Sequence, residues 1–432
     1  MRIAVLGMWH LGTVTAASLA SVGHEVLGYD EEESVVAGLR EGRLPIIEPG
    51  LAELVVQQTR GGSLRFSSDP TLLGDADVVW VAYDTPVDDQ DQADVDDVLD
   101  RVRNVFAHVK ADVLFLVSSQ LPAGSTRVLE ENFAAARPSV GVSFAYSPEN
   151  LRLGSALDVF LRPDRVVVGV RDSASRERIQ AMLAPITSRV EWMSVESAEM
   201  TKHALNSFLA TSIAFINEIA GICERVGADA GDVARALKSD VRIGPRAYLR
   251  PGPAFAGATL ARDVGFLGAL GAKVGRPTQL LTSVALSNDL HRAWPLRRLR
   301  ELMNHLAAAR VAVLGLTYKP GTNTLRRSTT VEICRELAKS GALVTAYDPS
   351  LQQLPTEIAA FIDLRPSASA AAAGAAALLI GNESPEFLGL DLETLVRGMA
   401  DPLVIDPGGF LESVLGKHHG IRYFKVGRQN ET

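Results

Sequence analysis

The sequence has no excess of basic residues. It carries 43 Lys and Arg against 51 Asp and Glu, which gives a formal net charge of -8 at pH 7. A protein that binds nucleic acid or an anionic membrane surface usually presents a basic face. We therefore expect no nucleic acid and no membrane among the partners of this chain. The acidic run "DDQDQADVDD" (88–97) is interpreted as a solvated loop followed by the start of a helix.

Cysteine is also scarce. Cys223 and Cys334 are the only two in 432 residues, and both lie in mostly apolar, helix-like stretches. Two thiols argue against a disulfide framework and favour a reducing compartment. The run "MRIAVLG" (1–7) is too short for a signal peptide, and the alanine-rich run at 368–381 predicts a helix followed by a buried strand rather than a membrane span. We expect a cytoplasmic protein.

What the sequence does contain is an alternation of apolar strands with helical patterns. The strands of the first part are nearly continuous apolar runs, which is typical of a parallel sheet covered on both faces. From about Ser197 a long helical pattern takes over, and from Arg310 the alternation returns. We predict an α/β protein with two Rossmann-like doubly wound domains, joined by a central helical region with a long connecting helix. The predicted domains are 1–196, 197–308 and 309–432.

The stretch "VLGMWHLGTV" (5–14) lacks a glycine that a dinucleotide-binding turn normally has. Such a turn uses three glycines, for the tight turn, for close approach to the pyrophosphate and for packing of the helix on the strand. Gly7 and Gly12 fill the first and third roles, but Trp9 takes the second. A tryptophan is tolerated if its backbone keeps φ below zero, because the helix N-terminus still attracts the anion. The alternative is a Rossmann-type fold that has lost its cofactor.

Asp30 stands at the end of the second predicted strand. This is the spacing expected for a carboxylate that binds the adenosine ribose hydroxyls. A carboxylate there would repel the 2′-phosphate of NADP, so the sequence favours NAD as the cofactor.

Seven stretches, in this order and spacing, resemble the UDP-glucose/GDP-mannose dehydrogenase family over nearly the whole length. They are "VVAGLREGRLPIIEPGL" (35–51), "YDTPVDDQDQADV" (83–95), "SPENLRLG" (147–154), "PDRVVVG" (163–169), "EMTKHALNSFLA" (199–210), "DVRIGPRAYLRPG" (240–252) and "VLGLTYKPGTNTLRRS" (313–328). The resemblance implies an NAD-binding domain, a central helical dimerisation region and a C-terminal domain that binds the nucleotide, UDP in the family's usual substrate. It also implies a nucleoside-diphosphate sugar as substrate and at least a homodimer.

The turn and the resemblance together imply two sets of binding residues. The resemblance implies that Arg242 reaches the substrate across a dimer interface. The implied cofactor-binding residues are Gly7, Trp9, His10, Leu11, Gly12, Asp30, Thr85, Pro86 and Arg326. The implied substrate-binding residues are Arg242, Tyr248, Arg250, Phe255, Gly257 and Lys319.

Four polar residues match the catalytic positions that the resemblance implies. Lys202 and Asn206 lie four apart on a predicted helix and share one face; in the family such a pair flanks the reacting carbon, steadies a water and stabilises oxyanion charge. Glu149 matches a glutamate that assists proton transfer, and Asp263 matches an aspartate that helps to activate the water. Without the resemblance, the charged residues read as a surface lysine, a solvated turn glutamate and a first-turn aspartate favoured by the helix dipole.

A cysteine is missing where the resemblance requires one. The family's glycine-rich loop carries a nucleophilic cysteine just before a helix, and "RPGPAFAGATLARDV" (250–264) has Thr259 in that place. A thiolate can trap the aldehyde of a two-hydride oxidation, whereas an aliphatic hydroxyl is not ionised near neutrality without a strong base beside it. The alternative is that Thr259 serves as the N-cap of the helix that begins there.

These features favour an NAD-dependent oxidoreductase that transfers one hydride from a nucleotide sugar and releases an aldehyde or ketone. Lys202, Asn206 and Asp263 would manage the hydroxyl proton through a water, with help from Glu149. The alternatives are a full four-electron oxidation to a uronate without cysteine, an epimerase that retains its NAD, and a non-catalytic nucleotide-sugar-binding protein. No metal site is predicted.

Overall fold

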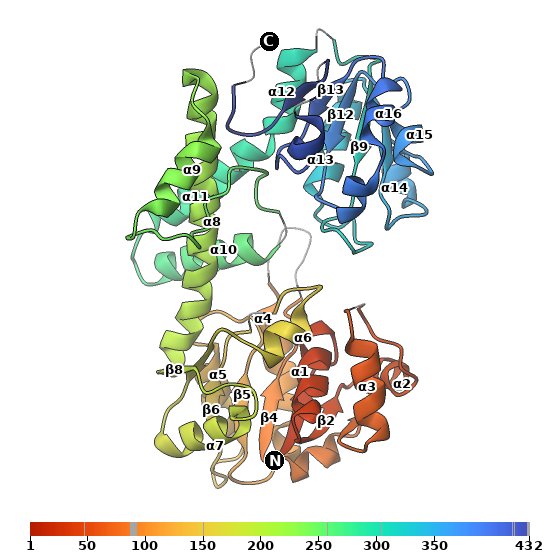
Figure 1. Ribbon diagram of the computed structural model, residues 1–432. Coiled ribbons are helices and arrows are strands. Elements are labelled where there is room, and N and C mark those ends of the chain that lie inside the picture. The colour runs from red at the N-terminus through yellow and green to blue at the C-terminus, as the bar shows by residue number, and fades with distance from the viewer. Residues whose placement is uncertain are drawn as a thin grey trace. The chain divides into compact units, whose positions relative to one another are not determined.

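The computed structural model describes residues 1–46, 48–86, 93–149, 151–256, 258–303, 305–416, 418 and 420–429. The chain divides into two compact units, Met1–Ala204 and Leu205–Thr432 (Figure 1). Each unit contains its own sheet.

The first unit is built on an eight-stranded sheet in the order β3-β2-β1-β4-β5-β6-β7-β8. Neighbouring strands are parallel except β6 and β7, which are antiparallel. The predicted doubly wound sheet is therefore confirmed, with one reversal. The strands are β1 (Arg2–Leu6), β2 (Glu25–Tyr29), β3 (Leu64–Ser67), β4 (Val78–Val81), β5 (Leu114–Val117), β6 (Ser143–Tyr146), β7 (Val166–Gly169) and β8 (Val190–Met193).

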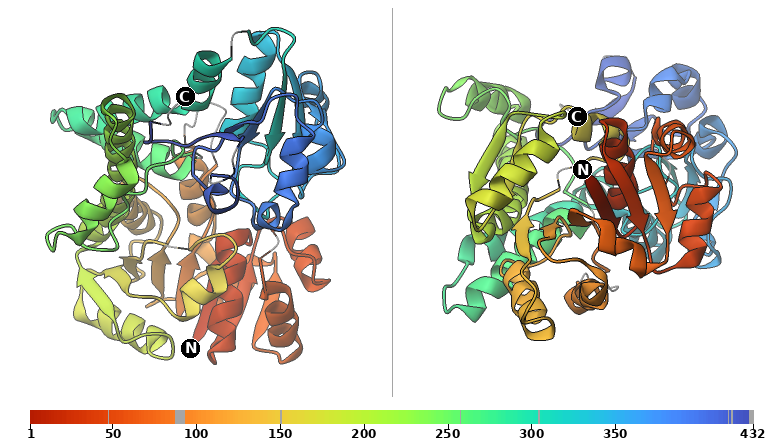
Figure 2. Two further views of the ribbon diagram at one scale, coloured as in Figure 1. Left: turned by 45° about the horizontal axis from the view of Figure 1, so that its top comes forward. Right: turned by 90° about the horizontal axis from the view of Figure 1, so that it is seen from below.

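Helices cover both faces of this sheet (Figure 2). One buried cluster joins one face to α1, α2, α3, α6 and α7, and a second joins the other face to α4 and α5. Burial on both faces is why β4 and β5 consist of apolar residues throughout. The helices are α1 (His10–Ser21), α2 (Glu33–Arg40), α3 (Leu51–Arg60), α4 (Val95–Asn104), α5 (Ser125–Ala136), α6 (Ala156–Leu161) and α7 (Ser173–Leu183), with 3₁₀ turns η1 (Pro70–Asp75) and η2 (Phe106–His108).

The long helix α8 (Val195–Val226) has 32 residues and confirms the predicted connecting helix. By length and composition alone it could cross a membrane. However, α8 also carries buried polar side chains that bond to other parts of the chain, as a core helix does: Glu199, Lys202, Asn206, Asn217 and Glu224.

The second unit combines further helices with a six-stranded parallel sheet in the order β11-β10-β9-β12-β13-β14. The run at 368–381 forms the predicted helix and buried strand, α15 and β12. The strands are β9 (Arg310–Leu314), β10 (Leu343–Tyr347), β11 (Asp363–Leu364), β12 (Ala377–Ile380), β13 (Leu403–Ile405) and β14 (Arg422–Phe424). The helices are α9 (Ala230–Ser239), α10 (Ala258–Lys273), α11 (Gln279–Arg292), α12 (Trp294–Leu302), α13 (Thr329–Lys339), α14 (Thr356–Ala359), α15 (Ala368–Ala372), α16 (Leu392–Arg397) and α17 (Glu412–Leu415), with the 3₁₀ turn η3 (Pro385–Gly389).

Candidate functional site

The turn after β1 requires glycine at both positions that the sequence supplies. Gly7 has φ +87°, and a Cβ on it would lie 2.8 Å from the Cα of Tyr83. A Cβ on Gly12 would lie 1.7 Å from the carbonyl oxygen of Gly7, because α1 packs directly on the turn. Neither position has room for a side chain, so this is the tight turn and close helix packing of a dinucleotide-binding strand and helix.

Trp9 is the residue that precedes α1. Its φ is -86°, it makes no side-chain cap, and its side chain is 47% exposed. The first helical bond runs from the Thr13 N–H to the Trp9 carbonyl, so the N–H groups of His10, Leu11 and Gly12 have no partner within the helix. Leu11 is buried and therefore offers only its backbone. Trp9 thus satisfies the condition on φ and leaves the helix N-terminus open to an anion.

Asp30 follows β2 directly and is buried. Among the described residues its carboxylate accepts two hydrogen bonds, from the Met8 N–H at 2.7 Å and the Glu32 N–H at 3.1 Å. A carboxylate has about four acceptor positions, so Asp30 retains capacity for ribose hydroxyls.

The loops after β4 and β5 lie next to the turn because β4 pairs with β1. The hydroxyl of Thr85 donates to the Gln120 carbonyl at 2.7 Å, and the Pro86 carbonyl accepts from the Asp94 N–H at 2.8 Å. This edge, where the strand order reverses beside β1, is where α/β sheets bind dinucleotides. Arg326 belongs to the second unit, where it is on an exposed loop.

A buried carboxylate that the sequence analysis left without a role holds the start of α1. Glu48 meets the His10 Nε2 at 2.9 Å and accepts from the N–H groups of Gly154 and Ala156 at 2.9 and 2.8 Å. Burial by itself raises the pKa of Glu48, but these partners outweigh it and the net pKa is lowered. Glu48 lies in the quoted stretch 35–51, but nothing in that pattern distinguishes it from a solvated loop glutamate.

The buried Lys202 pairs with the partly exposed Glu149 in the first unit. The Lys202 Nζ donates to the Glu149 carbonyl oxygen at 2.6 Å and lies 3.3 Å from Glu149 Oε1. The other carboxylate oxygen of Glu149 accepts from the Leu151 N–H at 2.8 Å. The Lys202 side chain is 6% exposed. The interpretation of Lys202 as a surface lysine is therefore wrong, and Glu149 is a partly exposed residue that is fixed by Lys202 and by the Leu151 N–H.

Asn206 and Asp263 form a second pair, within the second unit, and both are buried. The Asn206 Nδ2 donates to Asp263 Oδ2, and Asp263 is fully buried. Asp263 is the sixth residue of α10, so its interpretation as a first-turn aspartate is wrong. Since Lys202 and Asn206 occupy successive turns of α8, one helix carries both pairs.

The start of α8 is fastened by two residues that sequence reasoning missed. The Glu199 carboxylate accepts from the Gly124 N–H at 2.6 Å and the Thr126 N–H at 2.9 Å, at the beginning of α5. The His203 Nε2 meets the Leu121 carbonyl at 3.0 Å. Both residues are buried on α8 on either side of Lys202, so they fix the position from which Lys202 projects.

The loop ahead of α10 is held by buried amides and a histidine, which were also missed. Asn217 accepts from the Gly252 N–H at 3.0 Å, and His291 Nε2 meets the Gly252 carbonyl at 2.8 Å. Asn288 makes two bonds to the backbone of Phe255. Phe255 itself packs with apolar residues of α8, α10 and α11, so its side chain is part of the core.

Thr259 is an exposed residue inside the first turn of α10, which begins at Ala258. The N-cap interpretation is therefore wrong, because the N-cap is the residue that precedes the helix. Gly257, a predicted substrate-binding residue, lies outside the described residues.

Neither cysteine lies in the loop ahead of α10. Cys223 and Cys334 are both buried in helices, α8 and α13. Burial raises the pKa of the Cys334 thiol to about 12. A buried, protonated thiol is inert as a nucleophile.

A cavity of about 430 Å³ lies in the second unit, where loops follow β9, β12 and β13. Tyr248 and Lys319 line it, and the Lys319 Nζ lies 5.4 Å from the centre of the Tyr318 ring. Arg250 donates to Glu383 and to the Gly408 carbonyl, two residues of the lining, at 2.8 and 2.7 Å. This carboxyl-terminal edge is again the place where a doubly wound sheet binds its ligand.

Arg242 lies apart from this cavity. It is on an exposed loop, and its side chain is 85% exposed and pairs with Asp240 at 2.7 Å. Within one chain it therefore has no part in the cavity lining that the structure describes.

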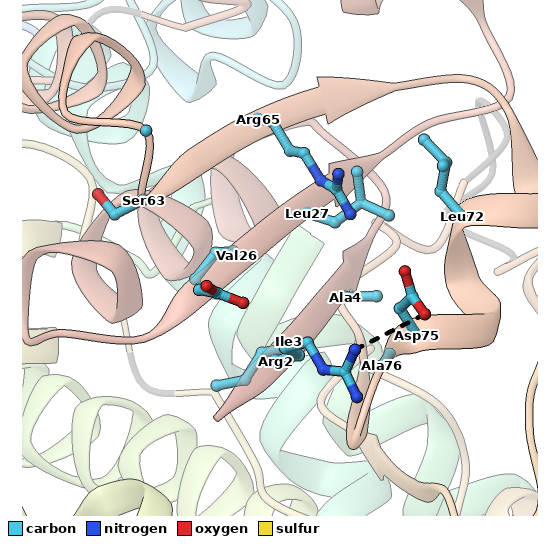
Figure 3. A pocket seen from close by; sticks show the side chains of 12 residues that line it. Arg2, Ile3, Ala4, Val26, Leu27, Ser63, Arg65, Leu72, Asp75 and Ala76 are labelled. Carbon is cyan, nitrogen blue, oxygen red and sulfur yellow. Dashed lines mark ion pairs between the residues drawn. The ribbon is translucent and has the colours of Figure 1, made fainter.

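A further cavity, of about 300 Å³, lies in the first unit at the opposite, amino-terminal ends of β1 and β2. Arg2 and Asp75 form an ion pair at 3.6 Å in its wall, and Arg65 lies over Leu27 (Figure 3). Because the strands are parallel, this cavity is separated from the turn at Gly7 by the length of the sheet.

Three domains of one family match the chain. Residues 1–187 match the NAD binding domain of the UDP-glucose/GDP-mannose dehydrogenase family, residues 196–290 its central domain and residues 312–413 its UDP binding domain. The chain is 34% identical to a UDP-glucose 6-dehydrogenase of Rhizobium meliloti, with 99% of this chain and 100% of the relative covered. It is 33% identical to a UDP-glucose 6-dehydrogenase of Pseudomonas aeruginosa, with 99% and 98% covered.

Solved structures share the fold. A UDP-glucose dehydrogenase from the archaeon Pyrobaculum islandicum superposes with a TM-score of 0.84 at 30% identity, covering 94% of this chain and 93% of that one. A UDP-D-ManNAc dehydrogenase from Pyrococcus horikoshii gives a TM-score of 0.86 at 23% identity, with 99% of both chains covered.

Proposed function

The chain belongs to the UDP-glucose/GDP-mannose dehydrogenase family and is an NAD-dependent nucleotide-sugar dehydrogenase, and we propose that it stops after a single hydride transfer. The observation that carries the proposal is Thr259 at the start of α10, with both cysteines buried in other helices. Without a thiolate to trap it, the aldehyde or ketone formed in the first oxidation is the product.

The residues of the first unit fit the cofactor. Gly7 and Gly12 leave the turn clear of side chains, and the N-terminus of α1 faces the edge where a pyrophosphate binds. Asp30 has acceptor positions left for the adenosine ribose. We assign His10, Leu11, Thr85 and Pro86 to the same site. NAD⁺, when bound, supplies the acceptor for the hydride that leaves the sugar carbon.

The two pairs on α8 supply the proton chemistry. Oxidation of an alcohol breaks one C–H and one O–H bond and forms the C=O bond. The Lys202 ammonium, held by Glu149, stabilises the oxyanion as the O–H proton departs. The proton goes to a water held by Asn206 and Asp263. The Glu149 carboxylate then accepts the proton from this water.

UDP-glucose is the first substrate to test, because the relatives named above are UDP-glucose 6-dehydrogenases. One hydride transfer from C6 would give the 6-aldehyde. We assign the nucleotide to the cavity of the second unit, with Lys319, Tyr248 and Arg250 as its polar contacts. We assign Phe255 and Gly257 to substrate binding and Arg326 to cofactor binding.

We also propose a homodimer formed through the central region, 197–308 in the predicted division of the chain. Large apolar side chains on α8 recur at intervals of seven and four residues and therefore share a face: Phe208, Phe215, Ile222 and Val226, each 46 to 69% exposed. Arg242 would reach the substrate of the partner copy from its exposed loop. Light scattering of the protein and of Phe215→Glu would test the dimer, which the charged side chain should dissociate.

The deciding experiment is the yield of NADH per sugar consumed, with the carbonyl trapped by hydroxylamine and identified by mass. One NADH and one trapped aldehyde or ketone support the proposal. Two NADH and a carboxylate would establish the second candidate, a four-electron oxidation to the uronate, which whole-length identity to UDP-glucose 6-dehydrogenases favours. Turnover of the sugar with no net NADH would instead establish an NAD-retaining epimerase.

Two variants test the residues, and each has a control. Lys202→Met should reduce kcat by about a thousandfold, the size of a positioned acid–base or oxyanion group, while Lys238→Met on α9 should match the wild type. Thr259→Cys should raise the yield toward two NADH per sugar, whereas Thr259→Ser should leave it at one.

A further inference from the structure

A cluster of charged residues lies beside Asp30 and has no role in the proposed reaction. The carboxylate of Glu31 lies 3.0 Å from the Nε of Arg101, on α4. The phenol of Tyr83 donates to the other oxygen of Glu31 at 3.3 Å. Burial raises the pKa of Tyr83 far above its usual range, so the phenol stays a neutral donor.

The cluster lies at the ribose end of the cofactor site. Glu31 follows Asp30 at the carboxyl end of β2, and Tyr83 follows β4. These two strands flank β1, which carries the turn. In folds of this kind the acid after the second strand binds the 2′-hydroxyl of NAD, and an arginine nearby accommodates the 2′-phosphate of NADP. Glu31 and Arg101 are therefore next to the atom in which the two cofactors differ.

Arg101 is held in place by more than Glu31. Its guanidinium lies 5.3 Å from the centre of the Tyr83 ring, a cation–π distance. Its Nε is also 3.2 Å from Asp97, one turn earlier on α4. Loss of the Glu31 charge would leave the guanidinium anchored on Tyr83 and Asp97 with a donor face available.

We propose that Glu31 is a specificity-determining residue that excludes NADP by two effects. Its carboxylate adds a second negative charge beside Asp30, and it occupies the arginine that would otherwise bind a 2′-phosphate. Arg101 is then a latent phosphate ligand, since a guanidinium matches phosphate geometry. The proposal rests on the NAD site at Gly7 and is independent of how many hydrides the enzyme transfers.

The test is a fluorescence titration of the full-length protein with NADH and with NADPH, in the absence of sugar. Glu31→Gln should tighten NADPH binding by about tenfold, the combined size of a new charge-assisted hydrogen bond and the removal of one charge repulsion. NADH affinity should stay within about threefold, because the adenosine ribose of NADH carries no phosphate charge with which Glu31 or Arg101 could interact. Adenosine 2′,5′-bisphosphate should compete better in the variant, and 5′-AMP equally in both proteins.

Two further variants separate the proposal from a general change in charge. Glu33→Gln removes a carboxylate two residues away that pairs with Arg40, and should leave both affinities unchanged. Adding Arg101→Ala to Glu31→Gln should abolish the tighter NADPH binding. Unchanged NADPH affinity in Glu31→Gln, tighter NADPH binding that survives Arg101→Ala, or the same tightening in Glu33→Gln would each overturn the proposal. Since the readout is binding, a two-hydride enzyme would refute the proposed function and leave this result standing.

Discussion

The two sheets begin with nearly the same sequence, "RIAVLG" (2–7) and "RVAVLG" (310–315), yet they end in different sites. Both glycines adopt the same backbone, with φ +87° at Gly7 and +89° at Gly315. Each second strand is followed by an aspartate, Asp30 or Asp348, that accepts from the N–H groups of its turn.

The two turns differ in the segment that joins each glycine to the next helix. Helix α1 begins three residues after Gly7, and no side chain caps it. Helix α13 begins fourteen residues after Gly315, and Ser328 caps it by accepting from the Val331 N–H. Asp30 accepts two hydrogen bonds from the described residues.

Asp348, in contrast, accepts four hydrogen bonds, from Leu316, Thr317 (twice) and Ser350. The first turn thus leaves the N–H groups at the start of its helix and some acceptor positions of its aspartate available to a ligand. The second turn uses the corresponding N–H and carboxylate groups in hydrogen bonds within the protein. The long loop of the second turn instead places side chains around a cavity. A shared strand-and-glycine pattern therefore fixes the turn but not the kind of ligand.

The largest expected effect comes from adding one carbon to each turn. In Gly12→Ala the new Cβ would meet the Gly7 carbonyl, and in Gly315→Ala it would meet Asn382. Both changes should cost about 2 to 3 kcal/mol in the free energy of unfolding. Gly12→Ala should also weaken NADH binding by at least about a hundredfold, because α1 is displaced. Chemical denaturation would measure the free energy of unfolding, and titration would measure the NADH affinity. Equal NADH affinity in the two variants would contradict the assignment of the cofactor to the first turn.

The two aspartates should separate ligand binding from stability. Asp30→Asn is expected to weaken NADH by about tenfold through the lost ribose contact, and to lower stability by about 1 kcal/mol because the Met8 or the Glu32 N–H loses its acceptor. Asp348→Asn should destabilise the protein by about 2 kcal/mol, because its amide nitrogen faces a backbone donor in either orientation, the Ser350 N–H or the N–H groups of Leu316 and Thr317. NADH affinity should stay at the wild-type value in Asp348→Asn. If Asp30→Asn lowered stability more than Asp348→Asn did and left NADH affinity unchanged, Asp30 would be the structural residue of the two.

The helix caps give a smaller contrast. Ser328→Ala should lower stability by about 1 kcal/mol, the usual value of a side-chain N-cap. Trp9→Ser should raise stability by a similar amount, because it adds a cap to α1, yet it should weaken NADH severalfold by using an N–H that the pyrophosphate needs. Thermal denaturation with and without NADH would measure both. If Trp9→Ser tightened NADH, the open terminus would not be the anion site.

Acid should loosen the start of α1 through Glu48 but not the start of α13, which Ser328 caps, and this is the smallest effect. The start of α1 is held through Glu48, whose folded-state pKa is lowered, whereas Ser328 at α13 does not titrate. A lowered carboxyl pKa contributes stability that is present above the unfolded pKa, near 4.5, and is lost as pH falls through the folded value. Glu48→Gln should flatten this part of the stability profile below pH 4.5. Ser328→Ala should keep the wild-type slope, and a profile unchanged by Glu48→Gln would contradict the assignment.

The sequence predicted those parts of the site that depend on spacing along the chain. Gly7, Gly12 and Asp30 belong to one strand, helix and strand, and Lys202 and Asn206 to one helix, so their relation follows from helix and strand geometry. It did not reveal Glu199, Asn217 or Asn288. These residues act on backbone groups 33 to 75 residues away in the chain, and only folding brings those groups to them.

The sequence by itself determined the two sheets, the connecting helix and the cofactor turn. Each follows from local patterns of apolar residues, glycine and spacing, which act over one or two elements. Only the tertiary structure decided that Lys202 is buried against Glu149, that Phe255 is core, and that Glu31 occupies Arg101. The physical reason is that burial and ion pairing depend on which distant segment lies opposite, and no local pattern encodes the neighbour.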